Sequence, residues 1–553
     1  MGVNDEGGMS ESKKMTLWLV LAGALIAALY GQFLHNPIVF DDLYFFMLDN
    51  EGHSAIEKFS SPALWDLRAL PYATLAWNAA LFGFDLLPFR IENLLLHWAV
   101  VAAMGLFVLS LYRAVLPSTN LSGEKTGVMS AVLIVVSLFA VHPLAVYAAG
   151  YLVQRTIVMA TLFSVLALYA WLRGCASQNR VWLWGSVVLY FLATHSKEHV
   201  IMLPAVVIAM TVLVHADWRA RVLRNWPVFA AYVAIALLTV AQIRGVLGHS
   251  YEINAGEMLD SAQSEHAWLY SLLTQSWLFF KYGLLWLLPN PSWISVDMRE
   301  PMAQGVFSVY GLAFLGYLLY GFAAIRLLFK RDRAGLIGFA LLFPWLMFAT
   351  EFSTVRLQEI FVLYRSYIWA LGGVIVLPLL LMQLNARLAL MLSVLFAATL
   401  FMVSMERLSS FSHPVLLWDD AEKLVKDRQS AIGVSRIYYN RGTAWLNEGM
   451  VDRAIPDMQR ATALNPRMSA GFYNLGLAYS KAAQNELAIA AFSRAIELDR
   501  ELAAPMNFRF YYGRAIAFEA SGQGTAAAAD YQVSCRLNGK RGCDKVGAAK
   551  VAP

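Results

Sequence analysis

Apolar runs recur along most of the chain, and they constrain its fold more than any other feature. Between Met15 and Val403 they are about 17–22 residues long, which is the length of an α-helix that crosses the hydrocarbon core of a membrane. Of all residues, 59% are hydrophobic and 15% are charged, whereas soluble domains have about 45–50% and about 25%. After Glu406 the composition is that of a soluble helical protein. The sequence therefore predicts an all-α protein with a polytopic transmembrane domain over 16–405 and a separate soluble domain.

Basic residues mark alternate loops of the transmembrane domain. Because cytoplasmic loops are rich in Lys and Arg, clusters such as Lys13–Lys14 and Lys330–Arg331 fit about eleven spans, with a cytoplasmic tail over 1–15 and the carboxyl terminus outside. The apolar stretches Leu70–Phe84 and Ala267–Leu288 are predicted to be interfacial or re-entrant helices, because the second, if it crossed, would put Lys330 outside. The net charge of +5 reflects the basic loops. The sequence has no long basic tract, so we predict no nucleic-acid partner. The spans are expected near 16–34, 91–112, 127–141, 156–172, 181–194, 199–215, 225–244, 305–327, 335–350, 366–384 and 388–405.

The soluble part contains an internal repeat of 34 residues. The period and the residue types are those of the tetratricopeptide repeat (TPR), in which a small residue lets two helices approach and an aromatic fills the groove. The repeated positions are Gly442, Trp445, Ala454, Met458, Ala461 and Pro466, then Gly476, Tyr479, Ala488, Phe492 and Ala495, and, in a degraded third unit, Ala515, Phe518, Ala527, Tyr531 and Ser534. About three repeats bury a continuous core. We expect a linker or helix over 406–434, a TPR α-solenoid over 435–540 and a flexible tail over 541–553. The array either binds protein partners or only packs on the membrane domain.

The chain has three cysteines, so it can form at most one intramolecular disulfide. Cys175 adjoins an apolar run, whereas Cys535 and Cys543 lie close together in the soluble tail. The pair would close a small loop in an oxidising compartment, and two free thiols fit the sequence equally well.

Nearly all the unusual polar residues fall in loops predicted to lie outside the cytoplasm. Asp41 and Asp42 follow the first span, and two carboxylates at a membrane boundary form either a solvated turn or a general base with its partner. Arg155 either snorkels to the interface or contacts a phosphate. His195 and His199 lie four residues apart, but no third metal ligand is close to them in sequence, so no metal site is predicted. The other candidates are His142, the cluster His195, Lys197, Glu198 and His199, and, in the last outer loop, Arg356, Glu359, Tyr364 and Arg365.

The motifs follow a specific order along nearly the whole chain. They are Phe40-Asp41-Asp42, Arg68-Ala69-Leu70, Trp77–Leu81, Ile91–His97, His142-Pro143, Gln154-Arg155, Ser196-Lys197-Glu198, Leu284–Pro289 and Tyr364–Tyr367, before the TPR array. This order resembles the TPR-linked GT-C glycosyltransferases, which include the eukaryotic transmembrane-and-TPR O-mannosyltransferases and their bacterial relatives. One departure is that Glu359 stands apart from Arg365 and no proline follows Tyr367.

The resemblance implies an inverting transferase that moves a sugar from a polyprenyl-phosphate donor to an acceptor outside the cytoplasm, most simply a protein hydroxyl. It implies that Asp42 or Asp41 removes the proton of that hydroxyl and that neither a metal nor another cofactor is needed. The cations expected to stabilise the departing phosphate are Arg155, Lys197, Arg356 and Arg365. A short array without organelle signals favours a bacterial inner-membrane protein with a periplasmic TPR domain. The alternatives are a surface polysaccharide or lipid acceptor, and a non-catalytic membrane scaffold.

Overall fold

The computed structural model describes residues 10–47, 54–63, 65–116, 125–244, 265–357, 359–428, 431–501 and 507–551. Over these ranges all regular elements are helices, apart from one isolated bridge between Met298 and Phe361. The chain divides into two compact units, the first comprising Met1–Met298 and Met302–His413, the second Arg299–Pro301 and Pro414–Pro553. Each unit is described by itself. The predicted outer loop from Arg244 to His266 lies almost wholly outside the described residues.

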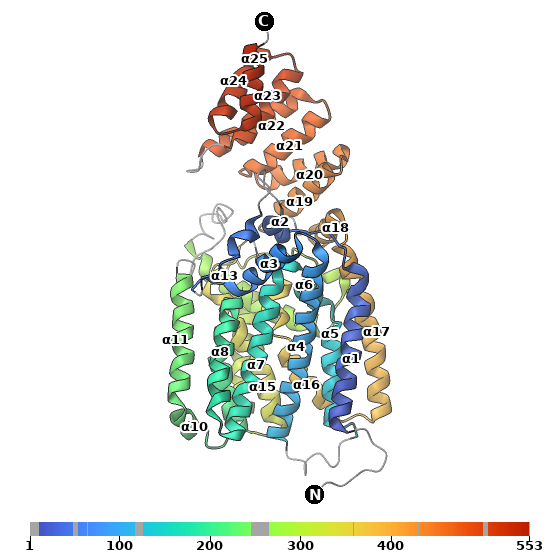
Figure 1. The fold of residues 1–553 in the computed structure, drawn as a ribbon, viewed down its shortest axis with the longest axis vertical. Helices are drawn as coiled ribbons and strands as arrows, with labels where there is room; N and C mark the ends of the chain where they lie inside the picture. Colours follow the sequence, from blue (N-terminus) through green and yellow to red (C-terminus); the bar gives the residue numbers. More distant parts are fainter. Residues whose placement is uncertain are drawn as a thin grey trace. The chain divides into compact units, whose positions relative to one another are not determined.

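The first unit is a bundle of long helices that run side by side (Figure 1). The helices of the bundle are α1 (Glu11–Tyr30), α4 (Leu86–Val115), α5 (Val128–Ala140), α7 (Arg155–Ser177), α8 (Arg180–Ser196), α9 (Leu203–Val214), α11 (Trp226–Ile243), α13 (Ala267–Leu287), α14 (Val309–Leu328), α15 (Arg333–Phe348), α16 (Leu371–Leu381) and α17 (Ala386–Ser410). The elements between them are η1 (Gly31–Phe33), α2 (Asp41–Phe46), η2 (Ala55–Phe59), α3 (Ala69–Phe82), α6 (Pro143–Ala149), η4 (Leu152–Gln154), η5 (Glu198–Val200), α10 (Trp218–Arg224), η8 (Pro291–Trp293), η9 (Ala349–Ser353) and η10 (Leu363–Tyr367).

In the described chain, 7 helices are long and apolar enough to cross a membrane, and the pair α5–α6, bent by 63°, would make 8. The remaining predicted spans coincide with helices of fewer than 18 residues, namely α8, α9 and α16. A helix therefore stands at every predicted span, although three are short for a full crossing. Helix α13 has 21 residues but is not among the 7. The number of crossings and the topology stay predictions.

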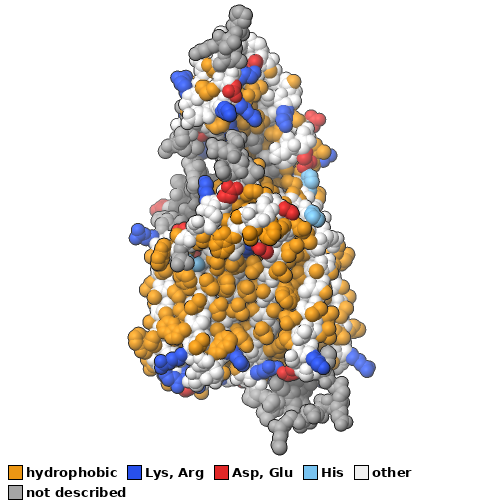
Figure 2. All heavy atoms as spheres, viewed as in Figure 1, with side chains coloured by type: hydrophobic (Ala, Val, Ile, Leu, Met, Phe, Trp, Pro, Cys, Tyr) orange, Lys and Arg blue, Asp and Glu red, His pale blue; other side chains and the backbone are white. Residues whose placement is uncertain are grey.

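Basic residues gather at one end of this bundle. Arg113 at the end of α4 pairs with Glu11 at the start of α1, at 2.9 Å. Arg331 before α15 donates from Nε to the carbonyl oxygen of Val212 at the end of α9, at 2.8 Å. Figure 2 shows the basic side chains along one rim of the first unit, beside a continuous hydrophobic surface on the sides of its helices. The loops that the charge pattern assigned to the cytoplasm thus share one end, which we call the basic end.

The opposite end of the bundle collects the other helix termini. Arg90 near the start of α4 donates from Nη2 to the carbonyl oxygen of Asn36, at 2.7 Å, and from Nη1 to that of Gly150, at 3.2 Å. The side-chain amide of Asn36 in turn donates to the carbonyl oxygen of Leu408 in α17, at 3.0 Å. These contacts tie the ends of α1, α6 and α17 to the start of α4. Because adjacent helices alternate in direction, this end carries the loops predicted to lie outside.

Exposed tryptophans flank the bundle at both ends. Tryptophan is enriched where a membrane meets water, so two such groups at the ends of an apolar bundle fit a membrane-spanning unit. The group at the basic end is Trp182, Trp184 and Trp226, and the group at the opposite end is Trp65, Trp77, Trp268 and Trp293.

The second unit is a row of helix pairs that carries the predicted repeats. After α18 (Pro414–Val425) come α19 (Val434–Asn447) with α20 (Val451–Leu464), α21 (Ser469–Lys481) with α22 (Asn485–Glu501), α23 (Phe508–Ala520) with α24 (Gly524–Arg536), and α25 (Lys540–Val551). The small repeat position is explained by Gly476, where an added Cβ would lie 2.7 Å from ring atoms of Phe492. The repeated small and aromatic residues thus fall within three helix pairs.

Two predicted end segments differ from the structure. The tail over 1–15 is shorter than expected, because α1 begins at Glu11, after Ser10 accepts a hydrogen bond from the backbone N–H of Lys13. The flexible tail over 541–553 is wrong as far as Val551, because residues Lys540–Val551 form α25. A disulfide between Cys535 and Cys543 joins this helix to α24, which resolves the alternative that the sequence left open.

Candidate functional site

A cavity of about 980 Å³ lies in the first unit, at the end opposite the basic end. It opens among the end of α8, the start of α7, the last turns of α11 and α15, and the segment after α1. Most of the predicted site residues line it, although they come from loops far apart in sequence. Those that line it are Asp41, Lys197, Glu198, His199, Arg356, Glu359, Tyr364 and Arg365, and those that do not are Asp42, His142, Arg155 and His195.

The two adjacent aspartates point to different places. Phe40, just before α2, has φ 53°, a left-handed backbone conformation that residues other than glycine rarely adopt. Such strain often marks functional sites. The short helix that follows leaves Asp41 half-buried on the cavity wall, while Asp42 is buried, with 1% of its surface exposed. Asp42 Oδ1 accepts a hydrogen bond from the backbone N–H of Val153, at 2.9 Å. Of the two, only Asp41 can reach a molecule in the cavity.

Burial also changes the ionisation of Asp42. It raises the pKa of this carboxyl to about 7, although the N–H of Val153 and the charge of Arg90 act in the opposite direction. At pH 7 such a carboxyl is about half ionised, but Asp42 does not line the cavity, so it cannot reach an acceptor hydroxyl there. Asp42 instead fixes the position of α2, and therefore of Asp41.

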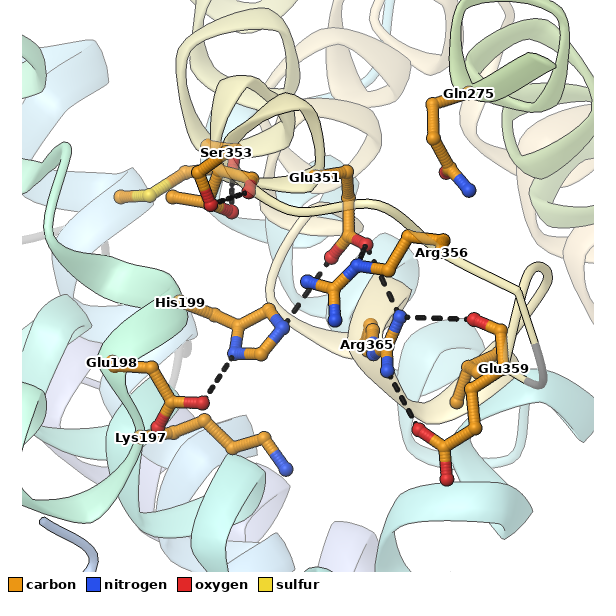
Figure 3. Close-up of polar contacts among 12 residues, drawn as sticks. Lys197, Glu198, His199, Gln275, Glu351, Ser353, Arg356, Glu359 and Arg365 are labelled. Carbon is orange, nitrogen blue, oxygen red and sulfur yellow. Dashed lines mark hydrogen bonds and ion pairs between the residues drawn. The ribbon is translucent and has the colours of Figure 1, made fainter. Parts of the chain in front are cut away.

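A charged network runs along one wall of the cavity (Figure 3). Its hub is Glu351, which has 1% of its surface exposed. Glu351 Oε2 lies 3.2 Å from Nε of Arg356 and 3.1 Å from Nη1 of Arg365. Arg365 extends the network, because its Nη2 donates to Oε2 of Glu359 at 2.8 Å. His199 lies on the other side of the hub, with Nε2 at 3.4 Å from Glu351 Oε1. The pairs of Glu351 with Arg356 and Arg365 are buried, so the removal of one partner leaves a buried charge poorly compensated.

The network continues from His199 to the start of α3. His199 Nδ1 lies 3.4 Å from Oε1 of Glu198, and Arg68 holds both oxygens of Glu198 in a bidentate pair, with Nε donating to Oε2 at 2.9 Å. Burial raises the pKa of Glu198, but the charge and hydrogen bonds of Arg68 outweigh burial and hold that pKa well below its usual value. Glu198 is therefore ionised and paired. Arg68 itself has φ 59°, a second left-handed residue at this site.

Lys197 differs from the other cations of the cavity. Its side chain is buried, with 3% exposed, and Nζ lies 3.4 Å from both Gln154 Oε1 and Thr156 Oγ1. Nζ also lies over the ring of Tyr364, 4.9 Å from its centroid. Among the described residues it forms no ion pair with a carboxylate. Burial, and after it the positive charge of Arg68, lower the pKa of Lys197 to about 7. An anion in the cavity would give this ammonium the partner it lacks.

Three predicted site residues have structural roles elsewhere. Arg155 has 1% of its surface exposed, and its guanidinium donates to Asn93 Oδ1 at 2.7 Å, to Thr74 Oγ1 at 3.1 Å and to the carbonyl oxygen of Phe89 at 3.1 Å. It also pairs with Glu92 Oε2 at 2.7 Å. All its nitrogens are thus engaged within the protein. We therefore withdraw Arg155 from the phosphate-binding group.

The two histidines are also used in packing. His142 accepts the N–H of Leu144 on Nδ1, donates from Nε2 to the carbonyl oxygen of Trp286 at 3.1 Å, and stacks on the Trp286 ring. His195 lies on the ring of Phe191, with centroids 3.9 Å apart, and its Nδ1 is 3.0 Å from the carbonyl oxygen of that residue. Neither histidine lines the cavity, so we drop both from the site.

The structure adds residues to the site that have no site role in the sequence-based prediction, although Glu351 is one of the charged residues of the last predicted outer loop. Arg68, Gln154 and Thr156 line the cavity, and Glu351 organises its arginines. Arg68 and Gln154 lie inside motifs of the family pattern, whereas nothing in the sequence marks Glu351 as the hub. Within the described part of the chain, no group of three or more His, Cys, Asp or Glu side chains is placed to hold a metal ion.

Comparisons with known proteins bear on the second unit. Residues 470–502, which cover most of α21 and α22, match the tetratricopeptide repeat family. No curated protein matches the chain. Among solved structures, the chain is similar to that of the MamA protein, with 22% identity, a TM-score of 0.21, and coverage of 28% of this chain and 83% of that one. It is also similar to the Cut9–Hcn1 hetero-tetramer of the APC/C, with 14% identity, a TM-score of 0.21, and coverage of 98% and 96%. Such low TM-scores carry no argument, so the TPR assignment rests on the family match and the helix pairs.

Proposed function

We propose that this chain is a membrane glycosyltransferase that moves a sugar, with inversion, from a polyprenyl-phosphate donor to a protein hydroxyl outside the cytoplasm. The observation that carries the proposal is the cavity, which joins a reachable carboxylate, a buried lysine that forms no ion pair with any described carboxylate, and an arginine-rich wall. Such a transfer needs a base for the acceptor and cations for the leaving group.

In the proposed reaction, the carboxylate of Asp41 takes the proton of the acceptor hydroxyl as its oxygen attacks the anomeric carbon of the sugar. The bond between that carbon and the phosphate oxygen breaks, and its electron pair leaves with the phosphate. Lys197 and Arg356 lie on the cavity wall, where their charges would stabilise the phosphate as it departs. Asp42 acts only through Asp41, as a positioning residue.

The apolar part of the cavity supports a lipid-linked donor. One wall consists of Ala236, Val240 and Ile243 on α11, and the lining also includes Ile201 and Met202. Helix α11 is the least covered of the candidate spans, with 17% of its apolar window buried. A polyprenyl chain in the membrane could therefore lie against this wall while its phosphate reaches Lys197.

We also propose the location and the role of the second unit. The basic end would face the cytoplasm, which puts the cavity at the outer surface of a bacterial inner membrane. The disulfide between Cys535 and Cys543 is expected in an oxidising compartment such as the periplasm. The TPR unit would then bind the polypeptide acceptor. The proposed chemistry uses no metal, and a chelator such as EDTA should leave the transfer unchanged.

A second candidate function is that of a non-catalytic scaffold. It is favoured by one observation, namely that the family match lies in the second unit, over residues 470–502. A surface polysaccharide or a lipid as acceptor is a variant of the main proposal, because the cavity chemistry would be the same.

The proposal is tested by mass spectrometry of glycopeptides from the native host. The strains would express wild type, Asp41→Asn or the control Arg113→Gln at matched levels, because Arg113 forms an exposed ion pair at the basic end. We expect a sugar mass to disappear from defined peptides with Asp41→Asn and to stay with Arg113→Gln. Unchanged glycopeptides together with altered surface glycans would point to the polysaccharide or lipid acceptor, and no change in either would favour the scaffold.

A further inference from the structure

Among the residues that the structure describes, Lys197 forms no ion pair with a carboxylate, although the next residue is Glu198. Lys197 has an extended backbone, with φ −159° and ψ 126°, between the end of α8 and the start of η5. Successive side chains of an extended segment point in opposite directions. Glu198 therefore turns towards α3, where Arg68 holds both its oxygens. This arrangement keeps the nearest carboxylate away from the ammonium.

Arg68 reaches Glu198 from a costly position. It precedes α3 in a left-handed conformation, with φ 59° and ψ 15°, which residues other than glycine, Asn or Asp seldom adopt. Strain of this kind persists only where the surrounding structure enforces it, and here the bidentate pair with Glu198 does so. Arg68 also lines the cavity.

We propose that Arg68 is a positioning residue that sequesters Glu198 and so keeps the Lys197 ammonium available to an anion in the cavity. Without Arg68, the carboxylate of Glu198 would be free to turn and pair with its neighbour, and the anion would have to compete with it. The proposal concerns the same site as the proposed function and rests on it for the identity of the anion, which would be the phosphate of the lipid donor.

The charges around Lys197 make the proposal testable through its protonation. Arg68 lowers the pKa of Lys197, and Glu198 raises it, so the two effects oppose each other in the intact site. Arg68→Gln removes the first effect and frees Glu198, and both changes raise the pKa. The double substitution of Arg68 and Glu198 removes both opposing effects, so the pKa of Lys197 should return to near its wild-type value. The groups that face Lys197 are Arg68, Gln154, Thr156, Glu198, Glu359, Tyr364 and Arg365.

The experiment measures the labelling of Lys197 by acetic anhydride as a function of pH, read by mass spectrometry on the full chain in lipid nanodiscs. It compares wild type, Arg68→Gln, the double variant Arg68→Gln/Glu198→Gln and the control Arg113→Gln. We expect Arg68→Gln to move the labelling midpoint of Lys197 upward by about 1–2 pH units. The double variant should return the midpoint to near the wild-type value. If Arg68→Gln does not fold, Arg68→Lys, which keeps a charge without the bidentate geometry, should shift the midpoint in the same direction by less.

A second readout is the binding of farnesyl phosphate, a short isoprenyl phosphate, to the same proteins. Arg68→Gln should weaken binding about tenfold or more, which corresponds to the loss of one charge-assisted contact, and the double variant should recover much of the affinity. A double variant no better than the single variant in both readouts would overturn the proposal, because Arg68 would then only support the fold. Predicted labelling shifts without any binding by wild type would instead uphold the role of Arg68 and contradict the polyprenyl-phosphate donor.

Discussion

The substitution Asp42→Asn separates the roles of the two adjacent aspartates. In the unfolded chain the Asp42 carboxyl titrates near its ordinary pKa of 3.8, whereas burial raises the pKa to about 7 in the folded protein. Between these values the folded state binds more protons than the unfolded state, so stability falls as pH rises from about 4 to about 7. A shift of about 3 units corresponds to about 4 kcal/mol, which is the full cost above pH 7.

Asparagine removes that cost and keeps the main contact. Its side-chain oxygen can still accept the hydrogen bond from the N–H of Val153, and it has no charge to desolvate. We therefore expect Asp42→Asn to raise the unfolding temperature in detergent at pH 8, with a gain of up to about 4 kcal/mol, and to leave it nearly unchanged at pH 4.5. The assay is thermal unfolding followed by tryptophan fluorescence at both pH values.

Asp41→Asn serves as the matched control, because this carboxylate is half-buried on the cavity wall. It should change the unfolding temperature little at either pH and should abolish sugar transfer. An equal loss of stability by Asp42→Asn at pH 4.5 and pH 8 would refute the reasoning, because the ionised Asp42 would then stabilise the folded protein.

Two further predictions concern ion pairing and the disulfide. Arg365→Gln leaves Glu351 and Glu359 without their common partner, so we expect a loss of about 3–5 kcal/mol in thermal unfolding. Loss of an exposed pair such as that of Arg113 with Glu11 should cost less than about 1 kcal/mol. Cys535→Ser opens the link between α24 and α25 and should lower the stability of the TPR unit by about 2–3 kcal/mol. Protease digestion of intact membranes should then release α25 sooner than in wild type, and equal rates would mean that the link contributes nothing.

The helices of both units could be predicted from the sequence, because apolar runs and a 34-residue repeat are local signals. A helix stands at each expected span, and the helix pairs of the second unit contain the repeated small and aromatic residues. Helix α25 was not predicted, because the disulfide that joins it to α24 was one of two open alternatives. The membrane topology is not tested by the fold.

The site could be predicted only in outline. Charge and polarity in the outer loops selected most of the residues that meet at the cavity, such as Lys197 and Arg356. Sequence could not separate Asp41 from Asp42, because the direction of each side chain depends on the strained turn at Phe40. It also could not reveal that partners within the bundle accept hydrogen bonds from every nitrogen of the Arg155 guanidinium, since those contacts come from helices distant in sequence.

The most direct test of the central claim is lipid mass spectrometry of the protein purified from native membranes. If the cavity binds a polyprenyl-phosphate sugar, that lipid should copurify with wild type and with Asp41→Asn, because Asp41 acts on the acceptor. It should be lost from Lys197→Met, which keeps the apolar stem and removes the charge. Absence of polyprenyl phosphates from all three proteins, or equal amounts in wild type and Lys197→Met, would contradict the account.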